Sequence, residues 1–289
     1  MKTANWRDFE ILDAGDGEKL ERWGGYILAR PDPQAIWPKR DKKAWENAHA
    51  SYQRSPDGGG AWEFHKQLPE RWEIGYGKLR FIVKPTGFKH MGLFPEQAVN
   101  WEYLMSAVKK SGGRARVLNL FAYTGGATAA CALAGAEVVH VDAAKGMVAW
   151  AKDNLAKSGL QNAPVRYLVD DVLKFVQREK RRGNAYEGII MDPPSFGRGP
   201  GGQVWHLEEG LYPLVEECAG LLSSSPVFFL LNSYTAGLAP GVLETILSMA
   251  VRSRLGGYVD SYELGLPIRS MEGAKLPCGA SGLWEAKAL

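Results

Sequence analysis

The chain has 289 residues, 45% of them hydrophobic, and a formal net charge of +3, which is too small to predict a nucleic-acid partner by itself. No stretch approaches the roughly 18 uninterrupted apolar residues of a membrane helix, and the first residues lack the apolar core of a secretory signal. Three scattered cysteines argue against a disulfide framework or a zinc knuckle, so we expect a cytoplasmic protein with no membrane and no metal partner.

Residues 1–90 differ in composition from the rest of the chain. They contain six of the ten tryptophans and all of the excess of basic over acidic residues, 16 against 13. Turn sequences such as Asp16-Gly17 separate short apolar runs such as 25–29 and 78–83, a pattern typical of a small β-rich domain. The tryptophans could supply core to short strands or a platform on which bases stack, and the sequence leaves both open.

Strand and helix signals alternate from residue 115 onward. Apolar runs predict strands at 116–121, 137–141, 165–169, 188–191 and 227–231. Helical patterns predict helices at 126–133, 144–158, 172–181, 207–222 and 241–254. Repeated β-α units predict a parallel sheet with helices on both faces, and two final strands at 257–264 and 282–289 predict a closing antiparallel hairpin. We therefore expect an α/β fold with a small β-rich domain at 1–90 and a mostly parallel sheet domain at 91–289.

The first predicted strand runs into the sequence Asn-Leu-Phe-Ala-Tyr-Thr-Gly-Gly, residues 119–126. Gly125 and Gly126 would let the backbone approach a ligand closely, and the start of the next helix offers N–H groups. The sequence is not G-x-G-x-x-G, so it does not match the phosphate-binding fingerprint of dinucleotide enzymes.

Acidic residues follow the second and third predicted strands. Asp142 can accept two hydrogen bonds from the vicinal hydroxyls of a ribose. One of Asp170 and Asp171 could accept from an adenine amino group, while the other caps the following helix. Because the carboxyl ends of parallel strands share one edge of a sheet, these residues together predict a site for a nucleoside cofactor.

The fourth predicted strand ends in Asp192-Pro193-Pro194-Ser195-Phe196. The rigid proline pair would hold a carboxylate, main-chain carbonyls and an aromatic ring at the end of the strand. A carboxylate and a carbonyl can accept from an amino group, and the Phe196 ring can pack on a flat heterocycle.

In this order, the motifs resemble those of class I S-adenosylmethionine-dependent methyltransferases, which have a Rossmann-like sheet. More narrowly, residues 119–125 with 192–199, and the preceding segment 86–97, resemble the group that contains bacterial 23S ribosomal RNA large-subunit methyltransferases. The resemblance covers residues 75–289. It departs from many class I enzymes at Asn119, where they have an acid, and at Ala122, where they have glycine.

The resemblance implies roles for the quoted residues. Those that would line the methionine portion of S-adenosylmethionine are Phe121, Tyr123, Thr124 and Gly125. Asp142 would hold the ribose and Asp171 the adenine, while residues 192–196, with Asp192, Pro193, Pro194 and Phe196 as the catalytic set, would orient the target. The implied substrate is RNA, ribosomal RNA in particular, and the sequence predicts no oligomeric state.

Transfer to nitrogen fits the residues better than transfer to carbon 5 of a pyrimidine, which needs a cysteine nucleophile near the fourth or fifth strand end. Neither end contains one, and Cys278, in the final loop, is the candidate that keeps the carbon reaction open. Asn232 and Tyr234 could line the target pocket. Residues 197–202 could form a lid in which Arg198 contacts phosphate.

Three other functions stay open at this point. The acceptor could be a small molecule or a protein side chain, with the tryptophan-rich region shaping its pocket. A nicotinamide-dependent dehydrogenase is disfavoured by the missing glycine fingerprint, and a non-catalytic RNA-binding module by the intact acids. The two basic clusters at 39–43 and 178–182 are interpreted as solvated surface.

Overall fold

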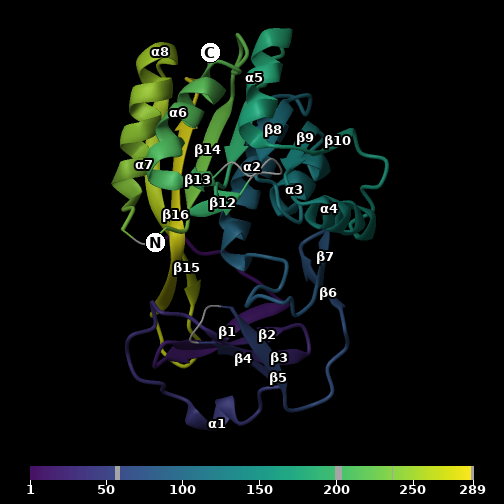
Figure 1. The fold of residues 1–289 in the computed structure, drawn as a ribbon, viewed down its shortest axis with the longest axis vertical. Coiled ribbons are helices and arrows are strands. Elements are labelled where there is room, and N and C mark those ends of the chain that lie inside the picture. Colours follow the sequence, from purple (N-terminus) through teal and green to yellow (C-terminus); the bar gives the residue numbers. More distant parts are fainter. Residues whose placement is uncertain (56–58, 199–203, 236, 288–289) are drawn as a thin grey trace. The chain divides into compact units, whose positions relative to one another are not determined.

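The computed structural model describes residues 1–55, 59–198, 204–235 and 237–287. The chain divides into two compact units (Figure 1). The first unit contains residues 1–99 and 264–278, and the second contains 100–263 and 279–289. The chain therefore leaves the first unit, forms most of the second, and returns to the first before its final strand ends.

The first unit is β-rich, as predicted. Its main sheet has five strands in the order β1-β2-β3-β4-β5, antiparallel except for the parallel pair β3–β4. The strands are β1 (Phe9–Gly15), β2 (Glu18–Trp23), β3 (Tyr26–Pro31), β4 (Ala50–Arg54) and β5 (Gly60–Phe64), with the short helix α1 (Lys42–Trp45) before β4. A separate hairpin pairs β6 (Trp72–Tyr76) with β7 (Leu79–Val83), and the 3-10 turn η1 (Pro95–Gln97) follows.

The six tryptophans of this unit are structural. Each donates its indole N–H to a partner within the unit, at 2.8–3.0 Å. Trp23, for example, is fully buried, packs edge-on against Phe9 and bonds Glu21. Of the two roles that the sequence leaves open for these rings, the contacts support the core role.

A buried ion pair joins β2 to β3 in the same unit. Both carboxylate oxygens of Glu21 accept from the Arg30 guanidinium, at 2.6 and 2.7 Å, and Lys19 lies 3.5 Å away. Glu21 is fully buried and Arg30 nearly so. Burial alone would raise the pKa of Glu21, but Arg30 and Lys19 reverse that effect and hold the pKa at about 2.

Replacing Glu21 by glutamine is expected to cost about 3–5 kcal/mol of unfolding free energy at neutral pH, because it leaves Arg30 buried without its counter-charge. The depressed pKa of Glu21 means that its contribution is complete above pH 4.5 and is lost as the pH falls toward 2. The E21Q variant should therefore lose less stability than the wild type over that window. Denaturant unfolding followed by tryptophan fluorescence measures both effects.

The matched control is the half-buried pair Lys39–Glu18, which also involves a residue of β2. Glu18→Gln should cost about 1 kcal/mol or less, because both side chains of this pair still reach solvent. Equal losses of unfolding free energy in E18Q and E21Q would show that the buried pair stabilises the protein no more than the Lys39–Glu18 pair does.

The second unit contains the predicted, mostly parallel sheet. Its seven strands lie in the order β10-β9-β8-β11-β14-β16-β15, parallel from β10 through β14, with β16 antiparallel to β14. The strands are β8 (Arg116–Leu120), β9 (Glu137–Asp142), β10 (Val165–Val169), β11 (Gly188–Met191), β14 (Phe228–Ser233), β15 (Tyr258–Pro267) and β16 (Lys275–Glu285). β15 and β16 contribute residues to both units.

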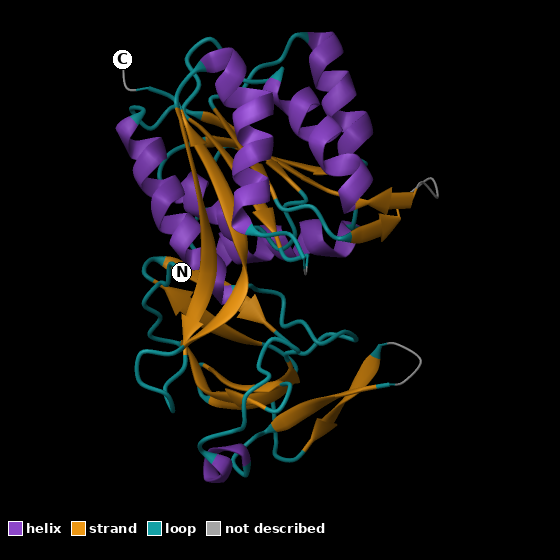
Figure 2. Ribbon diagram, turned by 90° about the vertical axis from the view of Figure 1, so that its left-hand side faces the viewer, coloured by secondary structure: helices purple, strands orange, loops and turns teal. Residues whose placement is uncertain are grey.

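Helices cover both faces of this sheet, as Figure 2 shows. One face carries α2 (Ala98–Lys110), α3 (Gly126–Leu133) and α4 (Lys145–Lys157), and the other carries α5 (Val172–Arg182), α6 (Leu207–Ala219) and α7 (Pro240–Leu247). α7 continues through a π-helical turn, η2 (Ser248–Arg252), into α8 (Ser253–Leu255), where the sequence predicts one uninterrupted helix. The buried core includes every residue of β11. None of the helices in the described ranges combines the length and the hydrophobicity needed to cross a bilayer.

Candidate active site

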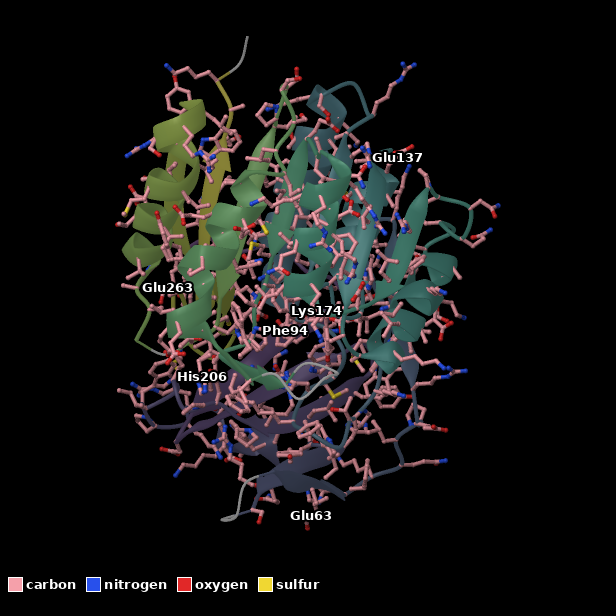
Figure 3. The ribbon with its side chains drawn as sticks, turned by 45° about the horizontal axis from the view of Figure 1, so that its top comes forward. Glu63, Phe94, Glu137, Lys174, His206 and Glu263 are labelled. Carbon is pink, nitrogen blue, oxygen red and sulfur yellow. The ribbon has the colours of Figure 1, made fainter. Side chains whose placement is uncertain are left out.

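The carboxyl ends of β8, β9, β10 and β11 bring the predicted residues to one edge of the sheet in the second unit. Figure 3 marks two helix starts at this edge, Lys174 in the first turn of α5 and His206 just before α6. Glu137, the first residue of β9, lies at the opposite end of the unit. Register confirms the alignment, because Met191 pairs with Leu120 and the next residues, Asp192 and Phe121, follow the strand ends together.

The turn after β8 has an unusual backbone. Phe121 and Tyr123 adopt positive φ angles of 55° and 51°, and Gly125 has φ 83° at the start of α3. A left-handed residue other than glycine costs about 1 kcal/mol or more and persists where its surroundings fix it. The turn is fixed by the Ala122 N–H, which donates to the Val141 carbonyl at 3.0 Å, and by Asn154 Nδ2, which donates to the Thr124 carbonyl at 2.9 Å.

Gly125 and Gly126 are required by packing. A Cβ on Gly125 would lie 2.9 Å from the Ala151 Cβ of α4, and a Cβ on Gly126 would lie 2.7 Å from the Trp101 ring of α2. The sequence assigns these glycines only to the approach of a ligand. The structure adds that they let α3 pack against two neighbouring helices.

Asp142 is held by two main-chain N–H groups. Its Oδ2 accepts from Tyr123 at 2.8 Å, and its Oδ1 accepts from Ala144 at 2.8 Å. Burial raises the pKa of this carboxyl, while the two hydrogen bonds oppose the rise. The contacts fix the orientation of the carboxylate and connect it directly to the turn after β8, residues 121–125, called the glycine turn below.

Asp170 and Asp171 both have structural partners. Asp171 caps α5, with Oδ1 accepting from the Lys174 N–H at 2.9 Å, and Asp170 forms an ion pair with Arg178. Asp171 thus takes the helix-capping role that the sequence leaves open for one of the two. Its other oxygen, Oδ2, has no hydrogen-bond partner in the described part of the chain, and its contact with adenine stays a prediction.

The segment after β11 is fixed by residues distant in sequence. Asp192 is half-buried, Pro193 is buried and Pro194 is exposed. The Pro194 carbonyl accepts from the Trp205 indole N–H at 2.7 Å, and the Ser195 hydroxyl lies 2.6 Å from that of Thr235.

Phe196 is 53% exposed and begins a small hairpin that the sequence does not predict. β12 (Phe196–Arg198) pairs with β13 (Val204–His206), and the Phe196 ring meets the His206 ring at 5.3 Å between centroids. The Arg198 side chain and residues 199–203, where the sequence suggests a lid, lie outside the described residues.

Trp205 contacts both Pro194 and Phe121, and no sequence motif includes it. Its indole N–H bonds the Pro194 carbonyl, and its ring lies 5.9 Å from the Phe121 ring. It therefore connects the segment after β11 to the turn after β8. Gly210 leaves room for it, because a Cβ there would clash with the indole. That helical glycine is the one sequence signal that could have drawn attention to this position.

Asn119 belongs to a buried polar row behind the turn. Its Nδ2 donates to Thr128 Oγ1 at 2.9 Å, and that hydroxyl lies 2.9 Å from His140 Nδ1. Burial lowers the pKa of His140 to about 4, so this residue is neutral at physiological pH. The row explains why an amide suits position 119, since an ionised acid there would be buried beside neutral partners.

No group of three or more histidine, cysteine, aspartate or glutamate residues in the described ranges could hold a metal ion. Cys278, the candidate nucleophile for the carbon reaction, is grouped with the first unit. Burial raises the pKa of its thiol well above the usual value, with nearby acids adding to the rise. Its S–H donates to the Leu276 carbonyl at 3.3 Å.

Comparison with known proteins matches this arrangement. A sequence model of a family described as S-adenosylmethionine-dependent methyltransferase matches residues 42–206. The crystal structure of the SAM-dependent methyltransferase from Agrobacterium tumefaciens is 38% identical, with a TM-score of 0.94 over 99% of this chain and 92% of that one. SMU.776 complexed with SAH, at 20% identity and a TM-score of 0.73 over 97% of this chain and 76% of that one, has the same fold.

Curated relatives match over a shorter stretch. Ribosomal RNA large subunit methyltransferase K/L from Shewanella baltica is 38% identical over 122 residues, and that from Chromohalobacter salexigens is 34% identical over 128 residues. These alignments cover 42% and 44% of this chain but 16% of each relative.

Proposed function

Because this chain belongs to the family of S-adenosylmethionine-dependent methyltransferases, we propose that it transfers the methyl group of that cofactor to a nucleobase of RNA, in particular ribosomal RNA. The observation that carries the proposal is the placement of Asp192 directly beside the glycine turn, at the ends of paired strands. The relatives named as ribosomal RNA methyltransferases support RNA as the acceptor.

The residues at the sheet edge fit this cofactor. The oriented carboxylate of Asp142 suits two ribose hydroxyls, and the left-handed turn at 121–125 presents main-chain groups to the methionine portion. Asp171, with one oxygen left after capping α5, suits the adenine amino group. S-adenosylmethionine supplies an electrophilic methyl group on a sulfonium sulfur when bound.

The protein's part in the transfer is alignment. Asp192 accepts from the amino group of the target base and turns the nitrogen lone pair toward the methyl group, while Phe196 packs against the base. The exposed Phe196 ring suits a base that has been turned out of its stack. The Pro194 carbonyl already accepts from Trp205, so the Pro193 carbonyl is the better second acceptor.

Transfer to nitrogen is supported by the state of Cys278. A nucleophilic cysteine needs a thiolate, whereas burial and nearby acids keep this thiol protonated. Cys278→Ser is therefore expected to keep its turnover, and a loss of activity with a trapped covalent adduct in the wild type would support the carbon reaction instead.

RNA binding has support from the first unit. In the basic cluster at 39–43, Lys39 pairs with Glu18, whereas Arg40, Lys42 and Lys43 are exposed. The second cluster is engaged in ion pairs, Arg178–Asp170, Lys180–Glu217 and Arg182–Glu179. The cluster at 39–43 is thus the better candidate for phosphate contacts.

The test is methylation of ribosomal RNA from a strain that lacks this gene, with radiolabelled S-adenosylmethionine and the purified chain. We expect label in an N-methylated nucleoside after digestion and mass spectrometry, and a rate at subsaturating RNA that falls steeply between about 50 and 200 mM salt. Absence of label in RNA, together with transfer to protein or small molecules of the extract, would contradict the proposal.

A further inference from the structure

A buried polar cluster lies beside Asp192 in the second unit. Its members are Asn100 in the first turn of α2, Asn232 on β14, and Tyr262 and Ser281 on the final strands, and all four are buried. Tyr262 donates to Asn100 Oδ1 at 2.7 Å, and Ser281 donates to Asn232 Oδ1 at 2.7 Å. Asn100 Nδ2 donates to Ser281 Oγ at 3.0 Å and to Asn232 Oδ1 at 3.1 Å.

These bonds fix which way the Asn232 carboxamide points. In this network the Tyr262 hydroxyl donates to the oxygen of Asn100, and the nitrogen of Asn100 faces Asn232. Turning the Asn232 carboxamide over would set its nitrogen against that nitrogen, and two donors would oppose each other. Burial raises the pKa of Tyr262, so its proton stays in place.

The nitrogen of Asn232 is left without a partner. Its oxygen accepts two hydrogen bonds, while Nδ2 has none from the described residues. His140 Nε2 is the one fully buried side-chain nitrogen or oxygen without a partner in the described ranges, so Nδ2 of Asn232 reaches solvent. Asn232 as a whole is 2% exposed, and the unused donor is part of that small exposed surface.

That donor lies at the edge where the target base is proposed to bind. β11 and β14 are parallel neighbours with Met191 opposite Leu231, so Asp192 and Asn232 are the next residues on adjacent strands. Neighbouring strands are about 4.8 Å apart, so the acceptor of Asp192 and the donor of Asn232 leave adjacent backbone positions and can converge on one base.

We propose that Asn232 contacts the substrate through a hydrogen bond donated by its Nδ2. The acceptor is a carbonyl oxygen or an unprotonated ring nitrogen of the base. It lies next to the amino group that donates to Asp192. The inference rests on the proposed function and narrows its substrate to bases with an amino group beside an acceptor. Uracil lacks an amino group and is excluded. Asn100, Ser281 and Tyr262 are positioning residues that hold the carboxamide in this orientation.

The decisive variant is Asn232→Asp, measured on ribosomal RNA from the strain that lacks the gene. It keeps the oxygen that Asn100 and Ser281 bond, but replaces the outward donor by an acceptor. We expect kcat/KM for this RNA to fall about 100-fold, because a mispaired polar group in a substrate site is strongly rejected, while affinity for S-adenosylmethionine stays within about three-fold. A wild-type rate in N232D would overturn the inference.

Ser281→Ala is the matched control, because it removes one bond to Asn232 but not the donor. Its kcat/KM should fall less than about five-fold, because Asn100 still bonds the Asn232 oxygen and holds the carboxamide, and its melting temperature measures the cost of the lost bond. If the activities of S281A and N232D simply follow their melting temperatures, Asn232 has a structural role only.

Tyr262→Phe keeps the inference testable if N232D does not fold. Without the phenol, Asn100 and then Asn232 can turn over, so we expect kcat to fall about ten-fold with little change in cofactor affinity. Unchanged kcat in Y262F would contradict the positioning role. A wild type that does not methylate RNA at all would contradict the proposed function. An active wild type with fully active variants would instead contradict only the role of Asn232.

Discussion

Replacing Asp192 by alanine is expected to lower methyl transfer to ribosomal RNA by at least about 1,000-fold and to leave the affinity for S-adenosylmethionine within about three-fold. Asp192 follows the end of β11 and is half-buried, at the position proposed to accept from the target amino group. Its loss should therefore remove alignment of the nucleophile rather than contacts to the cofactor. Single-turnover rates and calorimetry with the cofactor measure the two effects separately.

Asp192→Asn separates charge from shape. The asparagine keeps one acceptor oxygen, so we expect an activity between that of the wild type and that of D192A. If D192A lost cofactor affinity as strongly as activity, Asp192 would belong to the cofactor site and the proposed division of roles would be wrong.

Asp142→Ala is expected to raise the dissociation constant for S-adenosylmethionine about 100-fold, which corresponds to about 3 kcal/mol, while the rate at saturating cofactor changes little. The carboxylate is proposed to hold the ribose, and it also accepts from Tyr123 and Ala144. D142A should therefore lose thermal stability as well. Calorimetry measures the affinity for the cofactor. A thermal melt without cofactor measures how much the substitution destabilises the protein itself.

Asp171→Ala is the control for D142A, because Asp171 is a helix cap at the end of the neighbouring strand. The loss of the cap should cost about 1 kcal/mol of stability, with a smaller loss of affinity than in D142A. A cofactor affinity unchanged in D142A would show that the ribose lies elsewhere.

The sheet could be predicted because its strands carry strong local signals. The β11 prediction agrees with the structure at both ends, since an apolar run is closed there by Asp192 and two prolines. The order of acids along the chain then placed Asp142 and Asp192 at one edge, because parallel strands share an edge.

The missed parts depend on contacts between distant segments. The three-residue strands β12 and β13 are too short to show a period, so no pattern predicts the hairpin, and Gly210 by itself does not identify the contact of Trp205 with Pro194. The Asn100–Ser281 bond joins residues 181 positions apart. Such pairings are decided by tertiary packing, which single-sequence patterns do not contain.

The return of residues 264–278 to the first unit has a consequence for biosynthesis. Arg269 donates its N–H to the Ile11 carbonyl at 2.9 Å, and Ser270 bonds the buried Asp13, so this late segment bonds to β1, the edge strand of the sheet that begins the chain. Domains generally fold in order as they emerge from the ribosome. Here β1 gains these contacts only after nearly the whole polypeptide has been translated, so a fragment ending near residue 99 should lack them and be less stable than the complete first unit.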